Sequence, residues 1–144
     1  MAHAAKKQDD NHGLKEAVAQ FESIREMVDD LNAAEALRDQ DDNSEAYEEA
    51  EQAIHDDPLS VMVRGSWHEP GKADEEGPSE FEILLCTGGP AVRIIGKLDE
   101  HCQPVKAIIQ HQDWFKPWTD WQPSGASDKQ EILLPYCRQF YFGD

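Results

Sequence analysis

The chain has few basic residues. Lys and Arg number 13 of its 144 residues, against 30 Asp and Glu, and the formal net charge is −17. Proteins that bind the phosphates of DNA or RNA present Lys and Arg in excess. This balance therefore excludes unassisted binding to nucleic acid or to an anionic membrane surface. It favours a basic partner, or it serves solubility alone.

Long apolar runs are also missing. The longest, such as residues 83–85 and 132–134, fall far short of the roughly 20 residues of a membrane-spanning helix. The first 13 residues are polar and lack the apolar segment of a secretion signal. Cys86, Cys102 and Cys137 form an odd set without paired spacing, which is typical of reduced thiols. The sequence therefore predicts a cytoplasmic protein.

Motifs for metal binding and catalysis are absent as well. The sequence holds no C-x-x-C, H-E-x-x-H or G-x-S-x-G and no P-loop. Four residues alternate like the first ligands of an EF-hand calcium loop: Asp39, Asp41, Asn43 and Glu45. Ser44, however, replaces the glycine of that loop, and Ala50 replaces its final glutamate. We therefore predict no metal site, no cofactor and no enzymatic activity.

One segment is a candidate site for nucleophilic catalysis. Residues 86–89 (Cys-Thr-Gly-Gly) would place a thiol beside free backbone amides, and His111 is the candidate base. Cys86, however, ends an apolar strand, where cysteine usually serves as a small core residue. We favour that interpretation, and we expect Gly88 and Gly89 to form a hairpin turn that requires positive φ.

The first 58 residues, by contrast, contain the pattern of amphipathic helices. Apolar residues recur at spacings of three and four: Leu14, Ala17, Phe21, Ile24, Val28 and Leu31. This stripe predicts a helix that ends near Leu37. A second helix carries Tyr47, Ala50 and Ile54 on one face and ends before Pro58. The expected organisation is a disordered tail over residues 1–12 and an acidic helical hairpin over 13–58. The stripe also permits a homodimer through the first helix, although packing against the second is the interpretation we favour.

After Pro58 the apolar period changes to two. Four strands are predicted, over residues 59–64, 81–87, 91–98 and 105–112, and their tight turns favour an antiparallel meander. A last helix opens near Ser127, although Pro135 makes its course uncertain. Residues 59–144 are thus expected to form a four-stranded antiparallel sheet with an aromatic loop and a C-terminal helix. The fold class is α+β, with the helices covering one face of the sheet.

The aromatic loop holds four large side chains within eight positions: Trp114, Phe115, Trp118 and Trp121. Such residues either pack over the end of a sheet as core or bind bases, sugars or proline-rich peptides. A mixed arrangement would place Trp114 and Trp118 inside and leave Trp121 exposed. The alternative function is therefore a small-molecule or peptide binding module that uses this Trp-rich loop.

Negative charge is concentrated in the helical part. Residues 9–57 contain 17 acidic and 3 basic side chains, whereas residues 58–144 contain 13 and 8. Such a run is either a solvated face or an imitation of nucleic-acid phosphates that occupies rows of Lys and Arg on a partner. The carboxylates expected to bind such a partner are Glu22, Glu26, Asp29, Asp30, Glu45, Glu48, Glu49 and Glu51, with Trp118 and Trp121 as additional contacts.

Residues 58–144 also contain distinctive segments. These are residues 81–93 (FEILLCTGGPAVR), 112–114 (QDW) with 117–119 (PWT), and 138–143 (RQFYFG). They resemble a family of small acidic proteins of proteobacterial phages and mobile elements. No activity of that family is carried over to any residue here. The resemblance implies an anti-CRISPR or anti-restriction type of inhibitor, whose partner would be a basic nucleic-acid-binding complex of the bacterial host.

Overall fold

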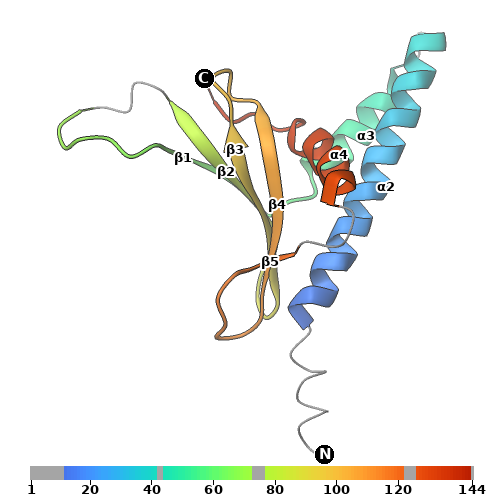
Figure 1. Cartoon of the computed structure of the whole chain (residues 1–144). Helices are drawn as coiled ribbons and strands as arrows, with labels where there is room; N and C mark the ends of the chain where they lie inside the picture. The colour runs from blue at the N-terminus through green and yellow to red at the C-terminus, as the bar shows by residue number, and fades with distance from the viewer. Residues whose placement is uncertain (1–11, 42–43, 73–76, 122–125, 144) are drawn as a thin grey trace, which may run out of the picture.

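The computed structural model describes residues 12–41, 44–72, 77–121 and 126–143. Along the chain run α2 (His12–Asp41), α3 (Glu45–His55), β1 (Ser60–Gly65), β2 (Pro78–Cys86), β3 (Ala91–Leu98), β4 (Pro104–Gln112), β5 (Thr119–Trp121) and α4 (Ala126–Cys137). The α+β class is confirmed, with helices at both ends of the described chain and an antiparallel sheet between them (Figure 1). The tail expected over residues 1–12 lies outside the described residues, except for His12, which begins α2.

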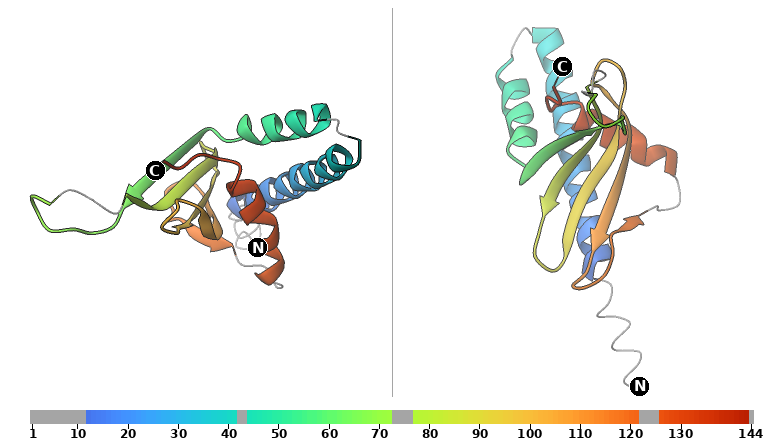
Figure 2. Two further views of the ribbon diagram at one scale, coloured as in Figure 1. Left: turned by 90° about the horizontal axis from the view of Figure 1, so that it is seen from above. Right: turned by 90° about the vertical axis from the view of Figure 1, so that its left-hand side faces the viewer.

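The apolar stripe of the first helix is buried as its spacing predicts. Ala17, Phe21, Ile24, Val28 and Leu31 are each at most 4% exposed. The helix runs four residues past Leu37, to Asp41. It contacts β3, β4 and α4 as well as α3, which lies beside its C-terminal half (Figures 1 and 2). The stripe therefore packs against the chain's own sheet and α4 as well as against α3, whereas the favoured interpretation had it packing against the second helix.

Within the described residues the sheet has five strands in the order β1-β2-β3-β4-β5, and every neighbouring pair is antiparallel. The prediction of four strands is thus wrong. The strand it missed, β5, is only three residues long and lies at the end of the predicted aromatic loop, where Trp121 pairs with Ile109. Three residues are too few to show an apolar alternation. The meander itself is confirmed, and it leaves β1 and β5 as the edges.

Alternation along each strand separates a core face from an open face. Phe81, Ile83, Ile94, Ala107 and Ile109 point to the core face and are at most 3% exposed. They form one cluster with the stripe of α2 and with residues of α4. Helices α2 and α4 lie on this side of the sheet, and no described helix covers the opposite side (Figure 2). The expectation that helices cover one face is confirmed.

The C-terminal helix is tied down at its last turn. Pro135 lies inside α4, two residues before its last residue, so that the helix continues past the proline to Cys137. Leu133, Tyr136 and Cys137 are fully buried, and the Tyr136 hydroxyl donates a hydrogen bond of 2.6 Å to Asp57 Oδ2. The helix is thereby joined both to the sheet and to the segment that follows α3.

Candidate functional site: an acidic helical face and a basic sheet row

The outward side of α2 carries a row of carboxylates. Glu22, Glu26, Asp29 and Asp30 are all exposed, and they lie on the side of the helix opposite Phe21, Ile24 and Val28. From Glu22 to Asp30 the helix axis spans about 12 Å, so the three intervals between the four charges average about 4 Å, which compares with about 3.4 Å per charge along one DNA strand. Within the described part of the chain, no ion pair engages any of these four carboxylates.

The shorter helix adds to this charge. Glu45, Glu48 and Glu49 on α3 are exposed, whereas Glu51 is only half-exposed because it lies on the flank nearer to the buried Ile54. Spacings of three and four residues place Glu45, Glu48 and Glu49 on one side of the helix. The structure thus brings seven of the eight predicted acids onto exposed helical surface. We call the exposed carboxylates of α2 and α3 the acidic face: Glu22, Glu26, Asp29, Asp30, Glu45, Glu48 and Glu49.

Basic side chains of the two helices do not neutralise the outer row. Arg38 lies 3.6 Å from Asp39 and 3.9 Å from Glu35, and its guanidinium stacks on Tyr47 at 4.1 Å. Arg25 lies over the Phe21 ring at 5.5 Å. These contacts join α2 to α3 and cover apolar surface. They leave the negative field of Glu22, Glu26 and Asp29 directed outward.

The aromatic loop does not have the mixed arrangement considered for it, in which Trp114 and Trp118 are inside and Trp121 is exposed. Trp121 is partly buried and packs edge-on against Phe21 with ring centroids 5.3 Å apart, so the expectation that it is exposed is wrong. Trp118 is half-buried beneath the guanidinium of Arg93, at 4.2 Å. Trp114, expected inside, is 65% exposed, and Phe115 is 98% exposed. The short strand β5 explains the inversion, since its pairing turns Trp121 toward the core.

The turn before β3 behaves as its glycines predict. Gly88 has φ +109, the positive φ expected of this turn. A Cβ at Gly89 would lie 1.2 Å from Nε1 of Trp114, so only glycine permits the indole to rest on this turn. The glycines therefore shape the turn and seat Trp114.

Cys86 does not form a catalytic pair with His111. Val92 lies between them, because it pairs with Cys86 on one side and with His111 on the other. Two strand spacings amount to about 9.5 Å. Burial and the neighbouring Glu16 carboxylate, 3.9 Å from the sulfur, raise the pKa of the Cys86 thiol. A raised pKa disfavours the nucleophilic thiolate.

The open face of the sheet carries a row of charged side chains that was not predicted from the sequence. Cross-strand neighbours point to the same side of a sheet. The register places Arg64 beside Glu80, Glu80 beside Lys97, and Lys97 beside Lys106. We call these four side chains the basic row. It carries three positive charges and one negative charge on a chain of net charge −17.

A second row, which is apolar except for Glu82 and which we call the apolar row, follows the basic row. Met62 pairs with Glu82, Glu82 with Ile95, and Ile95 with Ile108. A third row links Arg93, Gln110 and Asp120 by hydrogen bonds of 2.8 and 2.7 Å, and Arg93 also forms a 2.6 Å ion pair with Glu82. The polar side chains at this end of the open face are therefore hydrogen-bonded or ion-paired with one another.

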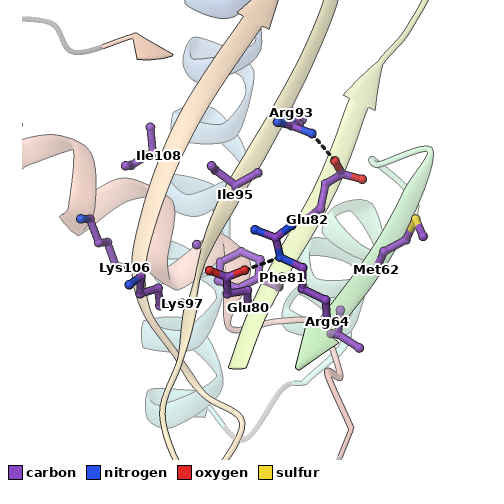
Figure 3. Close-up of a pocket in the computed structure, with 12 residues that line it drawn as sticks. Met62, Arg64, Glu80, Phe81, Glu82, Arg93, Ile95, Lys97, Lys106 and Ile108 are labelled. Carbon is purple, nitrogen blue, oxygen red and sulfur yellow. Dashed lines mark hydrogen bonds and ion pairs between the residues drawn. The ribbon is translucent and has the colours of Figure 1, made fainter. Parts of the chain in front are cut away.

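The basic and apolar rows enclose a cavity of about 310 Å³. Figure 3 shows Lys97 and Lys106 side by side at one end, with Ile95 and Ile108 next to them and the Arg64–Glu80 pair alongside. The alternation of Arg93, Ile95 and Lys97, and of Lys106 and Ile108, was the signal in the sequence that could have revealed this face. A count of charges along segments of the chain does not reveal this face, because residues of opposite strand faces are then added together.

No protein-family model, curated protein or solved structure gives a significant match to this chain. Among the described residues, no helix is both long and apolar enough to cross a membrane. The same residues contain no cluster of three or more His, Cys, Asp or Glu side chains placed to hold a metal ion.

Proposed function

We propose that the chain is an inhibitor-type binding protein that occupies the nucleic-acid groove of a basic host protein through its acidic face. The single observation that carries the proposal is the outward row on α2: Glu22, Glu26, Asp29 and Asp30 are exposed and unpaired within the described residues. Its mean charge spacing of about 4 Å is close to the roughly 3.4 Å of one nucleic-acid strand.

The rigidity of the helix supports this function. Ile24 and Val28, on the inner side of the same turns, are at most 4% exposed, so the carboxylates are held on a helix anchored in the core. A preorganised row loses less conformational entropy on binding than charges on a mobile tail. Long-range attraction to Lys and Arg would speed association, and salt would weaken it.

The proposed partner is a nucleic-acid-binding defence complex of a bacterial host, of the kind inhibited by anti-CRISPR and anti-restriction proteins. The resemblance of residues 58–144 to proteins of phages and mobile elements supports this choice. The proposed site comprises the acidic face together with the flank of Glu51, and Trp118 beside Arg93 is an additional contact. Homodimerisation through the first helix would need a surface other than its buried stripe.

The test is protection of an invading phage. A host strain with an active CRISPR or restriction system is challenged with a targeted phage while it expresses the chain. Expression is expected to raise plaque counts. Reversal of Glu22, Glu26, Asp29 and Asp30 to Lys should abolish that protection, and reversal of Glu45, Glu48, Glu49 and Glu51 to Lys should weaken it. Circular dichroism checks that each variant keeps its fold. Full protection by the folded α2 variant would show that the electrostatic mechanism is wrong.

A second candidate function is a peptide-binding module on the aromatic loop. The exposed Phe115 and Trp114, whose rings lie 5.7 Å apart, favour it. In that case Phe115→Ala would abolish binding to a proline-rich peptide library, binding would resist salt, and the Glu45–Glu51 reversal would have no effect. Salt-sensitive binding that survives Phe115→Ala would exclude this module.

A further inference from the structure

The basic row contains an energetically unfavourable pair. Lys97 and Lys106 lie directly opposite each other on neighbouring antiparallel strands. Side chains in that position have Cβ atoms about 4.5–5.5 Å apart, and like charges there destabilise the sheet. No hydrogen bond or ion pair engages either amine within the described residues, and the nearest acid in the row, Glu80, is paired with Arg64. The two ammonium groups therefore present unneutralised charge at one end of the cavity.

The adjoining wall is apolar except for Glu82, whose carboxylate is ion-paired with Arg93. Ile95 and Ile108 are half-buried, and Met62, at 59% exposed, lies across the cavity on the edge strand (Figure 3). The cavity volume of about 310 Å³ is at the lower end of the range of small-molecule sites, about 300–1,000 Å³. A charged end beside an apolar wall matches a ligand that has an anionic head and a small apolar body.

We infer that the open face of the sheet binds a small organic phosphate, with its phosphate between Lys97 and Lys106 and its apolar body against Ile95 and Ile108. The basic row has a net charge of +2, which matches a phosphate monoester of charge about −1.5 to −2 better than it matches a single carboxylate. This site is separate from the acidic face, and its occupation does not depend on the function proposed for that face.

Other occupants fit less well. A single turn of an acidic helix, about 10–12 Å across and 5.4 Å high, has a volume of more than about 400 Å³, which exceeds the cavity volume of about 310 Å³. Single-stranded nucleic acid is normally held by stacking on exposed aromatic side chains. The basic and apolar rows contain no aromatic residue, and Phe81, which also lines the cavity, is only 3% exposed. The carboxylates of α2 lie behind the sheet and the helix body, beyond the screening length of about 8 Å at physiological salt. They therefore repel a bound dianion only weakly.

The experiment is a titration followed by amide chemical shifts, with phenyl phosphate as the probe in 0.15 M salt. Inorganic phosphate lacks the apolar body and phenol lacks the charge, so both are compared at the same concentrations. We expect phenyl phosphate to shift amides of β3 and β4 and to bind about tenfold more tightly than either comparison compound.

The variant Lys97→Gln/Lys106→Gln should bind phenyl phosphate about tenfold more weakly or not at all. The matched control is Lys15→Gln/Lys72→Gln, which changes the net charge equally outside the cavity and should bind like wild type. The amide spectrum reports whether each variant is folded. Equal loss in both variants would overturn the site, because bulk charge would then explain the binding.

Four further outcomes, the last two of which concern other occupants, would also overturn the inference. One is an absence of shifts with millimolar phenyl phosphate. Another is equal binding of inorganic phosphate, which would make the apolar row irrelevant. The third is a tighter, length-dependent response to single-stranded oligonucleotides, and the fourth is self-association that the Lys97→Gln/Lys106→Gln variant abolishes. Either of the last two would identify a polymer or a second copy as the occupant.

Discussion

The outer side of α2 and the open face of the sheet carry charge in opposite ways. On α2, four carboxylates follow one another over residues 22–30, and no described ion pair engages them. On the sheet, Arg64 and Arg93 are each paired with a glutamate, and two lysines remain. A helix repeats one sign along its surface because spacings of three and four stay within one segment. A sheet assembles its surface from several segments, so a net charge of −17 describes neither face.

The two faces rest on one core, and the largest predicted effect follows from that. Ile24 is fully buried in the cluster shared by α2, the sheet and α4. Ile24→Ala should lower the free energy of unfolding by about 2–5 kcal/mol. Urea denaturation should show a single transition by both fluorescence and circular dichroism. The control Val18→Ala, on a 39% exposed residue of the same helix, should change stability by less than about 0.5 kcal/mol. Separate helix and sheet transitions would show that the two faces fold independently.

High pH should destabilise the core without involving either charged face. Burial raises the pKa of Cys137, and burial together with the hydrogen bond to Asp57 raises the pKa of Tyr136. Both groups stay neutral in the folded chain while the unfolded chain ionises, so their stabilisation is complete at neutral pH. It is lost above the ordinary values, 9.0 for Cys and 10.0 for Tyr.

The expected slope of this loss is about 1.4 kcal/mol per pH unit for each group once its unfolded form ionises. Urea midpoints between pH 8 and pH 11 measure it. Tyr136→Phe should remove only the part that begins near pH 10, and it should cost about 1–3 kcal/mol at neutral pH through the unpartnered Asp57. A stability that stays constant to pH 11 would contradict the burial of both groups.

The two arginines of the open face sharpen the contrast between networked and exposed charge. Arg93 holds Glu82, Gln110 and the Trp118 ring, and its side chain is 22% exposed, whereas that of Arg64 is 81% exposed. Arg93→Ala should cost about 1–2 kcal/mol. Arg64→Ala should cost at most about 0.5 kcal/mol. Thermal unfolding measures the loss of stability in each variant. Equal losses would show that the row around Arg93 contributes no stability.

The smallest predicted effect is a gain in stability. Lys106→Glu converts the like-charged pair with Lys97 into an opposite pair, and it should stabilise the chain by about 0.5 kcal/mol. Lys106→Gln, which removes the repulsion without adding attraction, should give a smaller gain. Thermal unfolding at low salt measures the change in stability of both variants. Destabilisation by Lys106→Glu would mean that the two lysines do not repel each other in the folded chain.

The sequence predicted the elements that have a long, regular pattern. The stripe from Ala17 to Leu31 is buried as its period predicts, and strand β3 has the predicted bounds. Strand β5 and the orientation of Trp121 were missed because three residues show no period and their pairing with β4 is non-local. Tertiary pairing, rather than local pattern, decides which aromatic side chain faces the core.

The candidate sites were predicted to unequal degrees for the same reason. Exposure of Glu22, Glu26 and Asp29 follows from the helical period alone. The basic row joins residues as distant as Arg64 and Lys106, and it depends on the register of four strands. No local spacing contains that register, since it is set by the turns and by the packing of the core face.

The most direct test of the acidic face is an affinity capture from a proteobacterial lysate, eluted by a salt gradient and by a short DNA duplex. The wild-type chain is compared with Glu22→Gln/Glu26→Gln/Asp29→Asn and with a control of equal charge change, Glu69→Gln/Glu100→Gln/Glu131→Gln. We predict that wild type and control capture the same nucleic-acid-binding protein, that salt and DNA release it, and that the α2 variant does not retain it. Retention by the α2 variant, or capture that neither salt nor DNA reverses, would contradict the proposal that this face imitates nucleic acid.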